Sequence, residues 1–98
     1  MFHKRPLPSG KVEVTFELPA SIWADSIYLV GDFNQWNTQS LPMKQRHSDG
    51  VWEITLTIDA GRDYQYRYLV NGTDWQNDLQ ADRYAPNPYQ SENSVIST

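Results

Sequence analysis

The sequence contains no cysteine, so it offers no disulfide framework, no thiolate metal ligand and no cysteine nucleophile. It also lacks an apolar stretch long enough to span a bilayer, and no apolar run follows the basic residues near its start, as a signal peptide would require. These features fit a reducing compartment, and we expect a cytoplasmic protein without a membrane partner. Positive charge is scarce too. The formal net charge is −4, which argues against nucleic acid as the main partner.

Helical periodicity is missing as well, because no window carries the apolar stripe of an amphipathic helix. Alternation with period two is clear instead, and Asn71-Gly72 is a strong hairpin signal. The predicted strands are residues 12–18, 27–31, 41–46 (short and weak), 52–58, 64–70 and 94–98 (a closing edge strand). This pattern predicts an all-β sandwich that forms a single domain over residues 1–98. Within it, residues 1–9 are expected to be a flexible arm and residues 77–93 a long loop.

Tryptophan is plentiful, with four residues in a chain of 98. Trp36 follows a strand in a polar loop, and Trp75 follows the hairpin turn between Asp74 and Gln76. Flat indoles beside amides suit a sugar, because a ring covers the C–H face while amides bond the hydroxyls. Two other readings stay open: Trp36 could be a lid on the sandwich edge, and Trp75 a cross-strand packing partner.

For Trp52 and Arg67, the position within an alternating strand predicts whether the side chain points into the core or outward. Trp52 alternates in step with Ile54, which predicts a core position, whereas Trp23 is expected to pack under the connection that holds it. Arg67 has the opposite parity to the apolar face of its strand. Its guanidinium should therefore reach solvent or an outer sheet face, where it could bind sugar hydroxyls or pair with a neighbouring carboxylate.

No catalytic constellation is visible. His3 and His47 are far apart, no serine stands in a nucleophile-elbow context, and a single-core domain leaves little room for the two-carboxylate cleft of a glycosidase. Asp74, Asp78 and Asp82 lack the spacing of a calcium loop. We therefore expect no enzyme activity, no cofactor and no metal.

Three segments together resemble family 48 carbohydrate-binding modules: Val30–Trp36, Tyr64–Val70 with the following Asn71-Gly72, and Tyr89–Ile96. These modules are early-set immunoglobulin-like domains found at the N-terminus of isoamylases and branching enzymes. A similar domain binds glycogen in the AMP-activated protein kinase β subunit. The resemblance covers about residues 11–98. It implies an immunoglobulin-like β-sandwich whose ligand is an α-glucan oligosaccharide or polysaccharide.

The resemblance also implies a set of carbohydrate-binding residues: Trp36, Trp75, Arg67, Asn93, Tyr89 and Ser91. The sequence departs from the family pattern at three points. Arg67 stands where lysine is usual, an extra residue (Thr73 or Asp74) precedes Trp75, and Tyr89 replaces an aliphatic residue. The expected function is non-catalytic α-glucan binding through stacked tryptophans. The alternative is a structural or protein-interaction module that has lost glycan binding, with a glucan-metabolising enzyme as a candidate partner.

Overall fold

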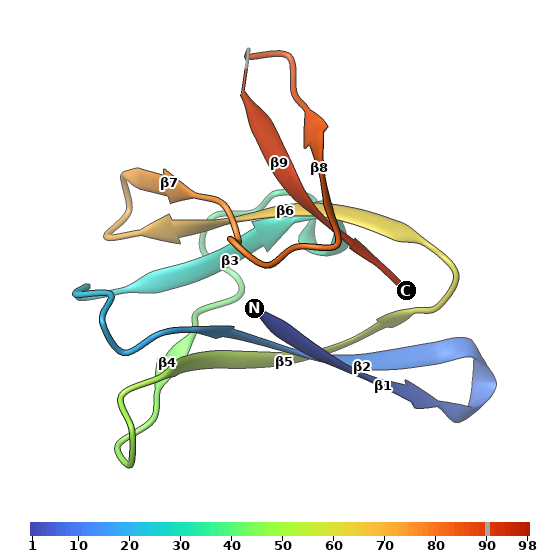
Figure 1. Cartoon of the computed structure of the whole chain (residues 1–98), viewed down its shortest axis with the longest axis horizontal. Coiled ribbons are helices and arrows are strands. Elements are labelled where there is room, and N and C mark those ends of the chain that lie inside the picture. Colours follow the sequence, from blue (N-terminus) through green and yellow to red (C-terminus); the bar gives the residue numbers. More distant parts are fainter. Residues whose placement is uncertain (90) are drawn as a thin grey trace.

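Two antiparallel sheets pack face to face in the computed structural model, which describes residues 1–89 and 91–98. Figure 1 shows the two layers, with the strand order β1-β2-β5-β4 in one sheet and β3-β6-β9-β8 in the other, where β7 also pairs with β6. The strands are β1 (Phe2–Leu7), β2 (Lys11–Leu18), β3 (Ile27–Gly31), β4 (Lys44–Gln45), β5 (Trp52–Asp59), β6 (Asp63–Val70), β7 (Asp74–Gln76), β8 (Arg83–Pro86) and β9 (Glu92–Ser97).

The expected immunoglobulin-like β-sandwich is confirmed. Apart from strands, the described residues form only short 3-10 turns, at Pro8–Gly10 and Asp32–Asn34. The period-two runs account for the core, because alternate residues of β2, β5 and β6 point inward. Trp52 is buried, as its parity predicts. The rings of Phe16 and Tyr66 meet edge to face between the sheets, with centroids 5.1 Å apart.

The hairpin predicted at Asn71-Gly72 is also confirmed. Asn71 and Gly72 have φ angles of 54° and 76°, and with Thr73 they form the three-residue connection between strands β6 and β7, in which the Thr73 amide donates to the Val70 carbonyl at 3.3 Å. The side-chain oxygen of Asn71 accepts hydrogen bonds from the backbone N–H groups of Asp25 and Ser26, at 2.7 and 3.3 Å. The turn is therefore tied to the residues that lead into β3.

The N-terminal residues correct the expectation of a loose arm. Phe2–Leu7 form β1, which pairs with β2 over six residues. The reason is the partly buried side chain of Phe2, which packs edge to face on Phe16 with centroids 6.0 Å apart. Four exposed residues follow Phe2 before Leu7, so the sequence shows no alternation here.

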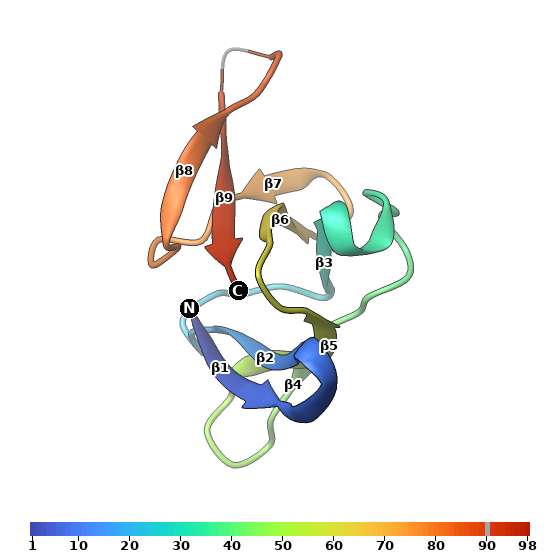
Figure 2. The ribbon, with the colours of Figure 1, turned by 90° about the vertical axis from the view of Figure 1, so that its right-hand side faces the viewer.

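The C-terminal half brings two further corrections. The expected loop 77–93 contains β8 at Arg83–Pro86, which pairs with β9. Strand β9 begins at Glu92 rather than residue 94, and it lies between β6 and β8, so it is not an edge strand. Strand β8 is held by backbone pairing with β9, and its side chains are mostly exposed, so they leave no apolar pattern in the sequence. Figures 1 and 2 show the β8–β9 hairpin projecting beyond the body of the sandwich.

Two smaller predictions also change. The strand expected at residues 41–46 shrinks to Lys44–Gln45, preceded by one isolated bridge between Tyr28 and Pro42. Trp23 does not pack under its connection, because 93% of its surface is exposed.

Candidate functional site

The loop after β3 places Trp36 over the outer face of β6. Gly31 begins this loop because a side chain would not fit there: a Cβ at this position would lie 2.5 Å from the carbonyl oxygen of Gln65. The backbone then turns through Gln35 and Trp36, both in the left-handed region with φ angles of 57° and 58°. The Trp36 amide donates to the Gly31 carbonyl at 2.9 Å. The turn thus carries the indole back toward the sheet.

Asn34 holds the same loop together from inside. Its Oδ1 accepts from the Gly31 amide at 3.1 Å, and its Nδ2 donates to the Asn37 carbonyl and the Ser40 hydroxyl, both at 2.9 Å. These bonds satisfy backbone groups that the turn would otherwise leave unpaired. The loop is therefore a cross-linked support for Trp36.

Arg67 lies at a break in strand pairing along one edge of β6. Strand β9 pairs with β6 from residue 63 to 66, and β7 pairs along the same edge from residue 68 to 70. Asn77 fills the break: its Oδ1 accepts from the Ser94 amide at 3.0 Å, and its Nδ2 donates to the Glu92 carbonyl at 2.8 Å. The same Oδ1 accepts a long bond of 3.4 Å from Arg67 Nε, and Arg67 Nη2 donates to the Ser91 hydroxyl at 2.7 Å.

Trp75 shares a sheet face with Arg67. It stands opposite Leu69 in the β6–β7 ladder, and Leu69 lies two residues beyond Arg67, so all three side chains project to the same side. Leu69 is 5% exposed, and Val30, opposite Arg67 on β3, is fully buried. The outer face of the sheet therefore carries buried apolar side chains beneath the site. Trp75 itself is 42% exposed. The residue inserted before it does not take it away from this face.

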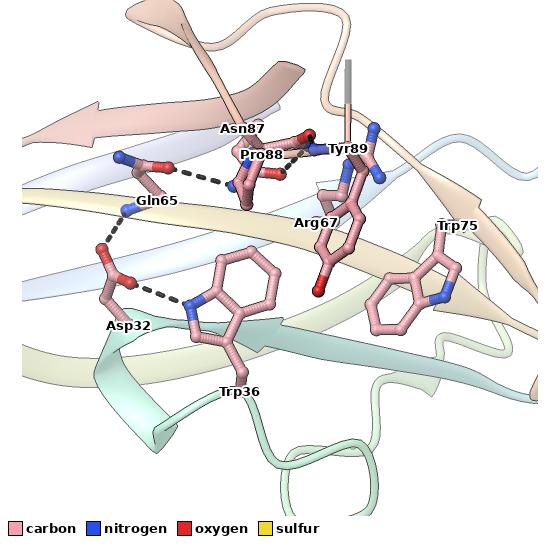
Figure 3. Close-up of a pocket in the computed structure, with 9 residues that line it drawn as sticks. Asp32, Trp36, Gln65, Arg67, Trp75, Asn87, Pro88 and Tyr89 are labelled. Carbon is pink, nitrogen blue, oxygen red and sulfur yellow. Dashed lines mark hydrogen bonds between the residues drawn. The ribbon is translucent and has the colours of Figure 1, made fainter. Parts of the chain in front are cut away.

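The tip of the β8–β9 hairpin forms the upper wall. Asn87 Oδ1 accepts from the Tyr89 amide at 2.9 Å and the Ser91 amide at 3.3 Å. The Asn87 amide donates to the Ser91 carbonyl at 3.0 Å. Tyr89 is 86% exposed, and Figure 3 shows its ring between the indoles of Trp36 and Trp75.

These parts enclose a hollow of about 600 Å³. It is lined by Asp32, Trp36, Gln65, Arg67, Trp75, Asn87, Pro88, Tyr89 and Asn93. Five of the six residues expected at a sugar site therefore line one hollow, and the sixth, Ser91, is bonded to Arg67. Figure 3 shows the labelled lining side chains gathered on one side of the sheet. Aromatic walls with a few polar groups are typical of a ligand site.

Asn93 differs from the other expected residues. It is only 9% exposed, and its amide is used within the protein. Nδ2 donates to Gln65 Oε1 at 3.0 Å, while Oδ1 accepts from Asn87 Nδ2 at 3.2 Å. Asn93 thus joins β9 to β6 and to the hairpin tip, and retains one N–H for a ligand.

Four lining residues were not expected from the sequence: Asp32, Gln65, Asn87 and Pro88. Gln65 could have been found, because it has the same strand parity as Arg67. Asn87 and Pro88 belonged to the region expected to be a loop, where no strand register was available to place them.

The acidic residues considered for calcium serve other contacts. Asp78 accepts from two tyrosine hydroxyls, Asp82 pairs with Lys4 at 2.8 Å, and Asp74 accepts from Gln76 at 3.0 Å. Within residues 1–89 and 91–98, no three histidine or acidic side chains gather as metal ligands would. The same residues include no helix with the length and apolar character of a membrane span.

Comparison with known proteins identifies the fold and the family. The profile of carbohydrate-binding module 48 (isoamylase N-terminal domain) matches residues 7–85. The chain belongs to this family. The module is 38% identical over 55 residues to 1,4-alpha-glucan branching enzyme GlgB 1 of Xanthomonas axonopodis pv. citri (strain 306), a match that covers 53% of this chain and 8% of the enzyme. With GlgB of Ralstonia nicotianae it shares 36% identity over 70 residues, or 66% of this chain and 9% of that enzyme.

The module therefore spans less than a tenth of the length of these relatives. Among solved structures, enterochelin esterase from Shigella flexneri aligns with 98% of the module and 32% of its own chain, with a TM-score of 0.76. The identity in that alignment is 12%, so the likeness concerns the fold alone. The family expected from the three sequence motifs is confirmed.

Proposed function

We propose that this module binds neutral α-glucan chains of the glycogen or starch type and performs no catalysis itself. The observation that carries the proposal is the shared hollow of Trp36 and Trp75, with Arg67 between them along the sheet. Each indole would stack on the C–H face of a glucose unit. Arg67, Ser91 and the free N–H of Asn93 would meet hydroxyls, and Tyr89 would cover the ligand from the hairpin side.

The expected affinity is modest. Each stacked ring contributes ~1 kcal/mol, judged from aromatic pair energies. Each hydrogen bond adds a net ~0.5–1.5 kcal/mol. After the cost of association, a dissociation constant between about micromolar and about millimolar follows.

A second candidate function is a structural or protein-interaction module. It is favoured by two large apolar side chains outside the hollow, Trp23 and Leu79, which are 93% and 92% exposed. Tryptophan is enriched among the residues that contribute most to binding at protein interfaces. A glucan-metabolising enzyme in the cytoplasm would suit both candidate functions, since the related modules belong to branching enzymes.

Titration with maltoheptaose or β-cyclodextrin, followed by tryptophan fluorescence, tests the proposal. Trp36→Ala and Trp75→Ala should each abolish measurable binding while circular dichroism stays that of the folded protein. Trp23→Ala is the matched control, because it removes an exposed indole that does not line the hollow. If the folded wild type binds neither sugar at millimolar concentration, the interaction module becomes the better reading.

A further inference from the structure

The indole N–H of Trp36 already has a partner inside the protein. Trp36 Nε1 donates to Asp32 Oδ1 at 2.8 Å. The other oxygen of the same carboxylate, Oδ2, accepts from the backbone N–H of Gln65 at 2.8 Å. Figure 3 shows both bonds, so one carboxylate links the ring of Trp36 to strand β6. Charge-assisted bonds of this kind are stronger than bonds between neutral groups.

The bond to Asp32 fixes the orientation of the Trp36 indole, which the loop backbone alone does not fix. The left-handed turn at Gln35 and Trp36 is an unfavourable conformation for residues with a Cβ, and its own bonds fix the main chain only. The plane of the indole depends on the side-chain torsions, which the main chain leaves free to choose between rotamers. Since both ring and carboxylate are bonded, the Asp32 contact selects one orientation. It directs the ring over the hollow.

The two tryptophans of the hollow therefore differ. Trp75 is placed by the backbone pairing of β7 with β6, and in the described part of the chain its Nε1 makes no hydrogen bond to protein. Trp36 has its only polar atom occupied, so it can offer a ligand its ring face alone. One indole is thus bonded to the protein through its N–H, while within the described residues the other is positioned by strand pairing alone.

We propose that Asp32 is a positioning residue of the carbohydrate site, which holds the Trp36 indole in the plane that stacks on sugar. The proposal rests on the proposed function, because it assigns Asp32 a role in affinity. Asp32 acts through Trp36, by removing the entropy that a free ring would lose on binding. Contacts with sugar hydroxyls then belong to the polar groups of the site, Arg67, Ser91 and Asn93.

The test compares Asp32→Ala, Asp32→Asn and, as a control for charge, Asp25→Ala, whose side chain is exposed in the connection before β3. Affinity for β-cyclodextrin should fall about tenfold in Asp32→Ala, from the cost of immobilising a free side chain. Asparagine keeps one acceptor but places its N–H₂ toward the second donor, so Asp32→Asn should lose less. Asp25→Ala should bind as the wild type does.

A second readout does not depend on sugar. In ¹⁵N–¹H spectra the Trp36 Nε1–H signal, assigned by its loss in Trp36→Phe, should exchange slowly with solvent. Asp32→Ala should remove this protection, while Asp25→Ala should leave it unchanged.

The outcomes separate the two claims. If folded Asp32→Ala keeps wild-type affinity, or if Trp36 Nε1–H stays protected in it, Asp32 is not a positioning residue. If the wild type binds no glucan, the proposed function fails, and loss of protection in Asp32→Ala still supports the placement of the ring. Should Asp32→Ala not fold, Asp32→Asn decides by the same two readouts, with partial protection as the supporting result.

Discussion

The guanidinium of Arg67 donates a 2.7 Å hydrogen bond to the hydroxyl of Ser91. The bond joins the middle of β6 to the residue before β9, across the break in strand pairing where β9 leaves β6. Arg67 forms no ion pair among the described residues, so its positive charge in the hollow is held by neutral oxygens. Its two bonds leave three N–H donors for a ligand.

Replacing Arg67 should weaken glucan binding in a graded way. Arg67→Ala removes charged donors and should lower affinity by ~1.5–3 kcal/mol, about tenfold or more. Arg67→Lys keeps the positive charge, but an ammonium group lacks the planar set of donors that bonds Asn77 and Ser91 together. The loss of glucan affinity in this variant should therefore be intermediate. Ser91→Ala should cost about threefold, because it releases one end of the guanidinium. Isothermal titration with maltoheptaose measures the series, and equal affinity for all four proteins would contradict the assigned role.

Salt should hardly affect the interaction. Stacking is short-ranged, and a neutral glucan displaces no counterions. The dissociation constant for β-cyclodextrin should change by less than about twofold between about 0.05 M and 0.5 M sodium chloride. A steep loss of affinity over this range would indicate that the hollow takes an anionic ligand instead.

Trp52 and Trp36 should differ in their effects on stability. Trp52 is buried in the core, and Trp52→Ala should destabilise the fold by about 3–5 kcal/mol. Trp36→Ala should cost about 1.5–2 kcal/mol, the low end for a bond to a charged group, because the bond to Asp32 is exposed. Equal losses in urea denaturation would mean that one of the two environments is misassigned.

Trp52→Phe gives a sharper result at the same position. The Nε1 atom of Trp52 is buried and has no hydrogen-bond partner within the described residues. Phenylalanine loses contact area but also removes this unpaired donor, which costs ~1–3 kcal/mol to bury. We therefore expect Trp52→Phe to cost about 1 kcal/mol or less, far below the alanine variant. A loss close to that of Trp52→Ala would show that packing alone decides the position.

The central strands could be predicted because burial imposes a period on them. Residues 12–18, 52–58 and 64–70 alternate, since one face of each meets the opposite sheet. Strand β8 could not be predicted, because its side chains are mostly exposed and its order comes from backbone pairing with β9. Strand β1 could not be predicted for a similar reason, because Phe2 is its main contact with the core and its other side chains form no alternating pattern.

The residues of the candidate site also divide into those that the sequence could predict and those that it could not. Trp36, Trp75 and Arg67 could be proposed from motifs and strand parity, and the structure brings them to one hollow. Asp32 and Asn93 act through side-chain bonds whose partners lie 4 to 33 residues away. No local pattern in the sequence encodes such partners. Trp23 was misread because its apolar character suggested burial, whereas the fold leaves it exposed.

The last prediction concerns alkaline pH and starts from a buried acceptor shared by two tyrosines. Asp78 Oδ2 accepts from the hydroxyls of Tyr66 and Tyr68 at 2.8 and 3.0 Å. Burial raises the pKa of both hydroxyls far above the ordinary value of 10.0. For Tyr66 the neighbouring Tyr68 and Asp78 raise the pKa further, and for Tyr68 the charge of Asp78 does so. Both tyrosines therefore keep their protons in the folded protein.

Stability should consequently fall as the pH rises above 10.0, the value at which the same hydroxyls ionise in the unfolded chain. The unfolded state then binds fewer protons than the folded state, so the free energy of unfolding decreases with pH. With two such groups the slope should approach about 2.7 kcal/mol per pH unit, and in Tyr66→Phe or Tyr68→Phe about 1.4. Tyr89→Phe is the control, because Tyr89 is exposed on the hairpin tip and its loss should leave the slope unchanged. Urea denaturation at several pH values between about 8 and 11.5 measures the slopes. Stability that stays flat up to the highest pH would show that the hydroxyls ionise equally in both states, against their burial beside Asp78.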